Sequence, residues 1–208
     1  MITVYNFGRG ARGLRITWLC EEMGLPYHLE TVPYPTPEAY RAKNPLGTVP
    51  FLEDEGGVAI NESVAILLYL AQKYGPTPLL PGKSDPTLAR VLQMTVFGET
   101  TIGASLNPLL AAHFAAPEAD KRNWSVRGQE ARLERAVSYV ADILGADPFL
   151  AGPDLTLADI SVSTALGIWR GALGKTLPDS LAAYQERVAA RPAYQRAKDR
   201  NSPSPNPS

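Results

Sequence analysis

A cluster of prolines divides this sequence into two parts with different hydrophobic patterns. Between residues 76 and 86 the chain carries Pro76, Pro78, Pro81, Gly82 and Pro86. Such a stretch does not continue a helix or a central strand, because proline fixes φ and lacks an N–H donor. Before the cluster, strand-like and helix-like patterns alternate, and after it every periodic segment is helical. We therefore expect a first domain at 1–76, a linker at 77–87, an all-helical domain at 88–200 and a disordered tail at 201–208.

The first part predicts the order β-α-β-α-β-β-α. Strand-like runs cover 2–5, 27–32, 49–52 and 58–60, and helical patterns cover 16–23, 37–42 (with Thr36 as a possible N-cap) and 62–74. The acidic and glycine residues at 54–57 indicate a hairpin between the last two strands. The opening β-α-β unit favours a parallel pair and the hairpin an antiparallel one, so we expect a mixed sheet covered by helices.

The second part predicts a helical bundle. Residues 88–114 are helical in pattern, with a possible bend near Gly98 and Gly103. Apolar residues at helical spacing mark a further helix over 133–144. Thr156 and Asp159 have the spacing of a capping box and precede a helix without a clear polar face, which indicates burial. Two short helices, near 180–190 and 193–199, complete the expected bundle.

Composition excludes several classes of function. Twenty basic and 21 acidic residues leave a formal net charge of −1, which argues against binding of nucleic acid or acidic membranes through overall charge. The single cysteine forbids an intramolecular disulfide and, with only two histidines, argues against a zinc site. The sequence shows neither a membrane-length apolar run nor a signal-peptide pattern, so we expect a cytoplasmic protein.

Several segments together resemble one known family. Residues 44–52 (NPLGTVPFL) and 60–66 (INESVAI) are similar to the glutathione-binding core of cytosolic glutathione transferases. Residues 155–160 (LTLADI) and 191–194 (RPAY) also resemble that family, so the similarity covers nearly the whole chain. The resemblance implies an α/β thioredoxin-like first domain and an all-α helical-bundle second domain. It also implies a homodimer with no cofactor, in which glutathione is a co-substrate for attack on a small hydrophobic electrophile.

Glu62 and Ser63 are the first candidate contacts with glutathione. They stand where a predicted strand ends and a helix begins, and a helix N-terminus offers amides and a positive dipole end to a carboxylate. The Ser63 hydroxyl adds a donor to the γ-glutamyl carboxylate, and Glu62 can accept from the ligand's ammonium group. The alternative is that either residue only caps the helix.

Val49 and Pro50 are the second pair of candidates. In the family that this sequence resembles, the corresponding bond is cis, and the residue before the proline pairs its backbone with the cysteine of glutathione in the manner of an added strand. Only about 5–6% of X-Pro bonds in folded proteins are cis, so the sequence alone would favour the trans isomer.

The group that activates the thiol has two candidates. Tyr5 stands at a strand end, four residues before Arg9 and Gly10, in the setting of the tyrosine-type branch of the family. The loop that follows, Ala11 to Gly13, has neither the Ser nor the Cys of the other branch, so backbone amides or Arg12 are the alternative. Lys43 is a further candidate, for the glycyl carboxylate.

Three functions are compatible with this resemblance, because one fold hosts many activities. The leading expectation is a glutathione transferase. The alternatives are another glutathione-dependent enzyme (a peroxidase, dehalogenase or isomerase) and a non-catalytic ligand carrier or interaction module.

Overall fold

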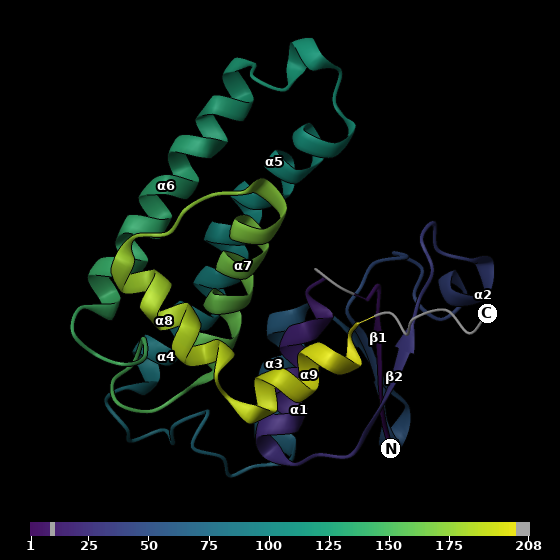
Figure 1. Ribbon diagram of the computed structural model, residues 1–208. Coiled ribbons are helices and arrows are strands. Elements are labelled where there is room, and N and C mark those ends of the chain that lie inside the picture. Colours follow the sequence, from purple (N-terminus) through teal and green to yellow (C-terminus); the bar gives the residue numbers. More distant parts are fainter. Residues whose placement is uncertain (9–10, 203–208) are drawn as a thin grey trace. The chain divides into compact units, whose positions relative to one another are not determined.

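The computed structural model describes residues 1–8 and 11–202, so Arg9, Gly10 and residues 203–208 of the expected tail lie outside the described residues. The prediction that the disordered tail begins at 201 is wrong, because Asn201 is buried and its side chain is hydrogen-bonded to Asn6 and Thr17. The chain forms two compact units (Figure 1). The first contains residues 1–77 together with the chain from Val188 on, and the second contains Pro78–Arg187.

A four-stranded mixed sheet is the centre of the first unit. Its strands are β1 (Ile2–Asn6), β2 (Tyr27–Thr31), β3 (Phe51–Asp54) and β4 (Val58–Asn61), with the turn η1 (Glu55–Gly57) between the last two. The spatial order is β2-β1-β3-β4. β1 and β2 are parallel, and the β1–β3 and β3–β4 pairs are antiparallel, which confirms the predicted mixed sheet.

Helices pack on this sheet and bury the apolar side chains of its strands. The helices are α1 (Gly13–Met23), α2 (Glu38–Arg41), α3 (Ser63–Lys73) and α9 (Pro192–Arg200). Successive side chains of a strand point to opposite faces. Val4 of β1 is fully buried, while its neighbour Tyr5 packs with Tyr40 of α2 and with Phe51. Thr36 does not cap α2 as predicted, because Pro37 occupies the N-cap and no side chain bonds there.

The last helix, α9, belongs to the first unit by its contacts, whereas the sequence expectation assigned it to the helical domain. It packs against α1 (Figure 1), where the ring centroids of Trp18 and Tyr194 lie 5.0 Å apart. Arg191, the N-cap residue of α9, makes a bidentate ion pair with Glu22 of α1. No change of composition precedes this helix, so the sequence offered no mark of the boundary.

The second unit is helical, as predicted. It contains α4 (Leu88–Phe97), the π-helix η2 (Gly98–Gly103), α5 (Ala104–Ala115), the 3-10 turn η3 (Glu118–Asp120), α6 (Trp124–Leu144), α7 (Leu157–Leu173) and α8 (Asp179–Ala189), whose last two residues fall in the first unit. The predicted irregularity near Gly98 and Gly103 is this π-helix. Gly98 lies so close to Ser161 that a Cβ would approach the serine Oγ to 2.4 Å, and the residue therefore has to be glycine.

The capping box that begins α7 is confirmed. The Asp159 carboxylate accepts the backbone N–H of Thr156 at 2.8 Å and its hydroxyl at 3.0 Å. The same carboxylate also accepts from the backbone of Leu150 and from the hydroxyl of Tyr184. Within the described part of the chain, no helix is long and apolar enough to cross a membrane. The described residues also hold no group of three or more His, Cys, Asp or Glu side chains that could bind a metal ion.

Candidate functional site

The strand register brings the predicted contact residues to one end of the sheet. Tyr5 of β1 pairs with Phe51 of β3, and Phe51 pairs in turn with Asn61 of β4. The three residues form a row across the sheet at the point where β1 and β4 end and β3 begins. The segments next to this row, Val49–Pro50 and Glu62–Ser63, therefore lie at the same end, which we call the site end of the sheet.

Glu62 holds a backbone conformation that non-glycine residues rarely adopt. It is the N-cap residue of α3, with φ 69° and ψ 109°, and its side chain makes no capping hydrogen bond. Such a conformation costs about 1–3 kcal/mol and is typical of functional sites. The exposed Glu62 carboxylate has no polar partner among the described residues. The capping alternative for this side chain is therefore not supported, and the carboxylate stays available to a ligand.

Ser63 accepts a hydrogen bond from a buried cation. Its side chain is almost fully buried, and Nη1 of Arg15, itself 1% exposed, donates to Ser63 Oγ at 2.8 Å. A hydroxyl that accepts from a guanidinium keeps its own proton, and no described residue accepts that proton. Ser63 can therefore donate to a carboxylate. Arg15 was not predicted as a site residue, although its position four residues before Leu19 places a charge on the apolar side of α1.

The Val49–Pro50 bond is cis, as the resemblance implies. The turn before it is fixed at one carbonyl, that of Thr48, which accepts the Tyr40 hydroxyl at 2.6 Å and the Asn44 amide at 2.8 Å. Among the described residues, nothing pairs with the backbone N–H or carbonyl of Val49. A rigid backbone segment with unpaired donor and acceptor is suited to strand-like pairing with a peptide ligand.

The Tyr5 hydroxyl donates a hydrogen bond to a carboxylate. The hydroxyl donates to Glu53 Oε2 at 2.5 Å and accepts from Lys43 Nζ at 2.8 Å, while Lys43 also pairs with Glu53 at 3.2 Å. Burial and the bond to Glu53 raise the pKa of Tyr5. Glu53 pairs with Thr3, two residues back from the row at the site end. The structure therefore joins two predicted residues, Tyr5 and Lys43, directly, and adds Glu53, which was not predicted, as a partner of both.

The start of α1 lies directly after the end of β1 and the connection that contains Arg9 and Gly10. Arg12 is the N-cap residue of α1 and makes no side-chain capping bond. The Asn6 side chain caps the helix in its place, because Asn6 Oδ1 accepts the N–H of Gly13 at 3.2 Å. Asn6 is 1% exposed and was not predicted as a functional residue.

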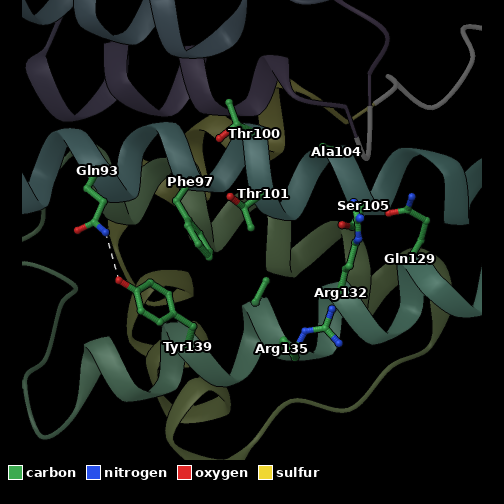
Figure 2. A pocket seen from close by; sticks show the side chains of 11 residues that line it. Gln93, Phe97, Thr100, Thr101, Ala104, Ser105, Gln129, Arg132, Arg135 and Tyr139 are labelled. Atoms are coloured by element: carbon green, nitrogen blue, oxygen red, sulfur yellow. Dashed lines mark hydrogen bonds between the residues drawn. The ribbon is translucent and has the colours of Figure 1, made fainter.

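The second unit has a cavity of its own, of about 520 Å³, between α4, the π-helix, α5 and α6 (Figure 2). The rings of Phe97 and Tyr139 lie 5.3 Å apart on its wall, and Gln93 donates to the Tyr139 hydroxyl at 3.1 Å. Arg132 and Arg135 line the same cavity, and neither guanidinium has an ion-pair partner among the described residues. The lining of this cavity is therefore mixed, with two aromatic rings and two guanidinium groups.

Comparison with known proteins gives a consistent result. Residues 12–73 match the family model for the glutathione S-transferase N-terminal domain, and residues 103–195 match the model for the C-terminal domain. The chain is 31% identical to the glutathione S-transferase stcT of Emericella nidulans, over 91% of this chain and 88% of that protein. It is 29% identical to the glutathione S-transferase GstA of Escherichia coli O157:H7, over 76% of each. A crystal structure of a glutathione transferase from Methylococcus capsulatus superposes with a TM-score of 0.82 at 31% identity, covering 97% of this chain and 98% of that one.

Proposed function

Because the chain belongs to the glutathione S-transferase family, we propose that it binds glutathione at the site end of the sheet and ionises its thiol for attack on a small hydrophobic electrophile. One observation carries this proposal. The row of Tyr5, Phe51 and Asn61 aligns Val49–Pro50 with Glu62–Ser63, so a backbone pairing surface stands beside a carboxylate-binding helix start.

The γ-glutamyl end of glutathione would be held at the start of α3. Its carboxylate would accept from the Ser63 hydroxyl and from the first amides of the helix, where the dipole favours negative charge. The ammonium group would donate to the Glu62 carboxylate, which the positive φ of this residue presents beside Ser63. The bond from Arg15 supports this role, because it orients the Ser63 hydroxyl as a donor.

The cysteine of glutathione would pair with Val49. The unpaired N–H and carbonyl of Val49 can exchange hydrogen bonds with the ligand's backbone, which is strand addition on the scale of one residue. Such pairing does not depend on the side chain at 49. It depends on the backbone conformation at position 49, which is fixed by the hydrogen bonds to the Thr48 carbonyl before it and by Pro50 after it.

Two groups are candidates for the ionisation of the thiol. One is the start of α1, where the helix dipole and the Arg12 guanidinium would stabilise a thiolate. Tyr5 is the second candidate, and it would have to exchange Glu53 for the sulfur as the acceptor of its proton. Lys43 already donates to Tyr5 and Glu53, which leaves one of its three N–H donors for the glycyl carboxylate.

Family membership further supports a homodimer, a cytoplasmic location and no cofactor other than glutathione as co-substrate. Sedimentation at micromolar concentration tests the homodimer, and a monomer under those conditions would contradict it.

Calorimetric titration with glutathione and with S-methylglutathione is the test of the binding site. Both should bind, because the Glu62–Ser63 and Val49 contacts do not involve the sulfur, and only glutathione should release a proton as its thiol ionises. A parallel assay with a generic aryl halide measures turnover. Binding without turnover of any electrophile or peroxide would make the protein a carrier, and absence of glutathione binding would overturn the proposal.

A further inference from the structure

Buried side-chain amides link the last described helix to the candidate site. Asn6 Nδ2, at the end of β1, donates to Asn201 Oδ1 at 2.6 Å, although 195 residues separate the two in sequence. Asn201 Nδ2 donates in turn to Thr17 Oγ1 in α1 and to the carbonyl of Ala197 in α9, both at 2.7 Å. The exposed fractions of Asn6, Thr17 and Asn201 are 1%, 0% and 5%. We call these three residues the amide brace.

The brace ends on the first turn of α1. The first N–H groups of a helix have no partner within the helix, and Asn6 Oδ1 accepts one of them, that of Gly13. The approach is close, because a Cβ at position 13 would lie 2.2 Å from Asn6 Cγ. Arg12, one of the two candidate groups for the ionisation of the thiol, is the residue directly before Gly13.

The partners of each amide fix its orientation. The Asn201 NH2 group has two acceptors, so its oxygen must face Asn6. The Asn6 NH2 group must then face Asn201, which leaves the Asn6 oxygen for the Gly13 N–H. Rotating either amide would bring two buried donors or two buried acceptors together, which is costly without water. Asn201 Oδ1, at 2.6 Å, therefore holds the Asn6 NH2 group away from α1, and the Gly8 carbonyl is a second, longer acceptor of that group at 3.4 Å.

We propose that Asn201 is a positioning residue for the glutathione site, acting through Asn6 on the first turn of α1. This inference rests on the proposed function, because it assumes that the thiol binds near that turn. With Asn201 in place, the Gly13 amide and the backbone of Arg12 are held against the end of β1. Without it, the Asn6 NH2 group keeps only the longer bond to the Gly8 carbonyl, and the Asn6 cap on the first turn of α1 is weakened.

Asn201→Ala is the direct test. Thr17→Val is a second variant, which removes one of the two acceptors of the Asn201 amide together with the long bonds from the Thr17 hydroxyl to the carbonyls of Gly13 and Leu14. In both we expect the Kd of glutathione to rise, about tenfold for Asn201→Ala, which corresponds to one hydrogen bond of ordinary strength. The ionisation of bound glutathione, followed by the ultraviolet absorbance of the thiolate, should also move to higher pH. Glu22→Gln is the matched control, because it breaks the ion pair of Arg191 that also joins α9 to α1 and leaves the brace intact.

A purely structural role predicts a different pattern. All three variants would then lower the melting temperature, and none would change the Kd or the pH of thiol ionisation, which would overturn the proposal. A loss of glutathione affinity in Glu22→Gln as large as that in Asn201→Ala would also overturn the proposal.

A measurement without ligand separates this inference from the proposed function. Hydrogen exchange of the Gly13 amide should accelerate in Asn201→Ala and stay as in the unmodified protein in Glu22→Gln. If the unmodified protein does not bind glutathione, the proposed function fails while the exchange experiment still tests the brace. Unchanged exchange at Gly13 in Asn201→Ala overturns the inference whatever the protein binds.

Discussion

Two hydroxyls of the candidate site differ in the charge of their partner. The Ser63 hydroxyl accepts from the Arg15 guanidinium and has no described acceptor for its own proton. The Tyr5 hydroxyl donates to the Glu53 carboxylate and has Lys43 as its donor. Both side chains were predicted from the sequence as contacts with glutathione, and both lie beside the site end of the sheet.

The difference shows that the partner of a hydroxyl decides what that hydroxyl can offer to a ligand. A hydroxyl oriented by a cation is a ready donor to an anion such as a carboxylate or a thiolate. A hydroxyl that already donates to a carboxylate must break a strong, charge-assisted bond before it can donate elsewhere. We therefore expect Ser63 to be essential for binding and Tyr5 to contribute little to the ionisation of the thiol.

The largest effect is expected from Asp159→Ala, which lowers the stability of the second unit and sets the baseline for the comparison of the two hydroxyls of the first. The change leaves the Leu150 amide and the Tyr184 hydroxyl buried without their acceptor, at a cost of about 1–3 kcal/mol each. The free energy of unfolding should fall by about 3 kcal/mol or more. Turnover measured well below the melting temperature should stay close to normal, and lost turnover with an unchanged melting point would place Asp159 in the site instead.

The next effect is expected from Ser63→Ala, which removes the available donor. Glutathione affinity should fall by about 1–3 kcal/mol, the range for a hydrogen bond to a charged group. Calorimetry on the two proteins gives this difference directly, with Asp159→Ala as the control for a general loss of stability. An unchanged Kd would mean that Ser63 only completes the helix start, and the contrast with Tyr5 would then have no functional meaning.

Local patterns and the family resemblance marked Ser63 and Val49 as candidates in the sequence, whereas their partners required the structure. A strand followed by a helix and an X-Pro pair are visible within a few residues, and the Thr156–Asp159 capping box is equally local. Arg15 lies 48 residues from Ser63, and Tyr5 lies 48 residues from Glu53. No periodicity reports on contacts of that range, because they depend on how β1, α1 and α3 pack. The role of α9 and of Asn201 was missed for the same reason.

Glu53→Gln tests the Tyr5 half of the comparison through pH. The pKa of Tyr5 is raised by burial and by Glu53, while Lys43 lowers it. Without the carboxylate, the contribution of Glu53 is lost and that of Lys43 remains, so the pKa of Tyr5 should fall. Tyrosine labelled at the ring carbon that bears the hydroxyl allows this titration to be followed by NMR, with Tyr5→Phe to assign the signal. A pKa of Tyr5 that does not move would show that Glu53 is not its acceptor in solution.

The smallest effect is expected from Tyr5→Phe. The substitution keeps the ring and its packing against Tyr40 and Phe51 and removes only the hydroxyl. Because that hydroxyl already donates its hydrogen bond to Glu53, its removal should cost the thiolate little stabilisation. Turnover near neutral pH should change by less than about threefold, or about 0.6 kcal/mol. The pH–rate profile should stay where it is, whereas Arg12→Ala should move it to higher pH, since a thiolate beside a lost cation is less favoured. The opposite pattern would be a tenfold fall in turnover with an alkaline shift of the pH–rate profile in Tyr5→Phe, and neither change in Arg12→Ala. It would mean that the Tyr5 hydroxyl donates to the sulfur of bound glutathione instead of to Glu53. Tyr5 would then be the thiol-activating residue, and the acceptor of its proton would differ between the free and the bound protein.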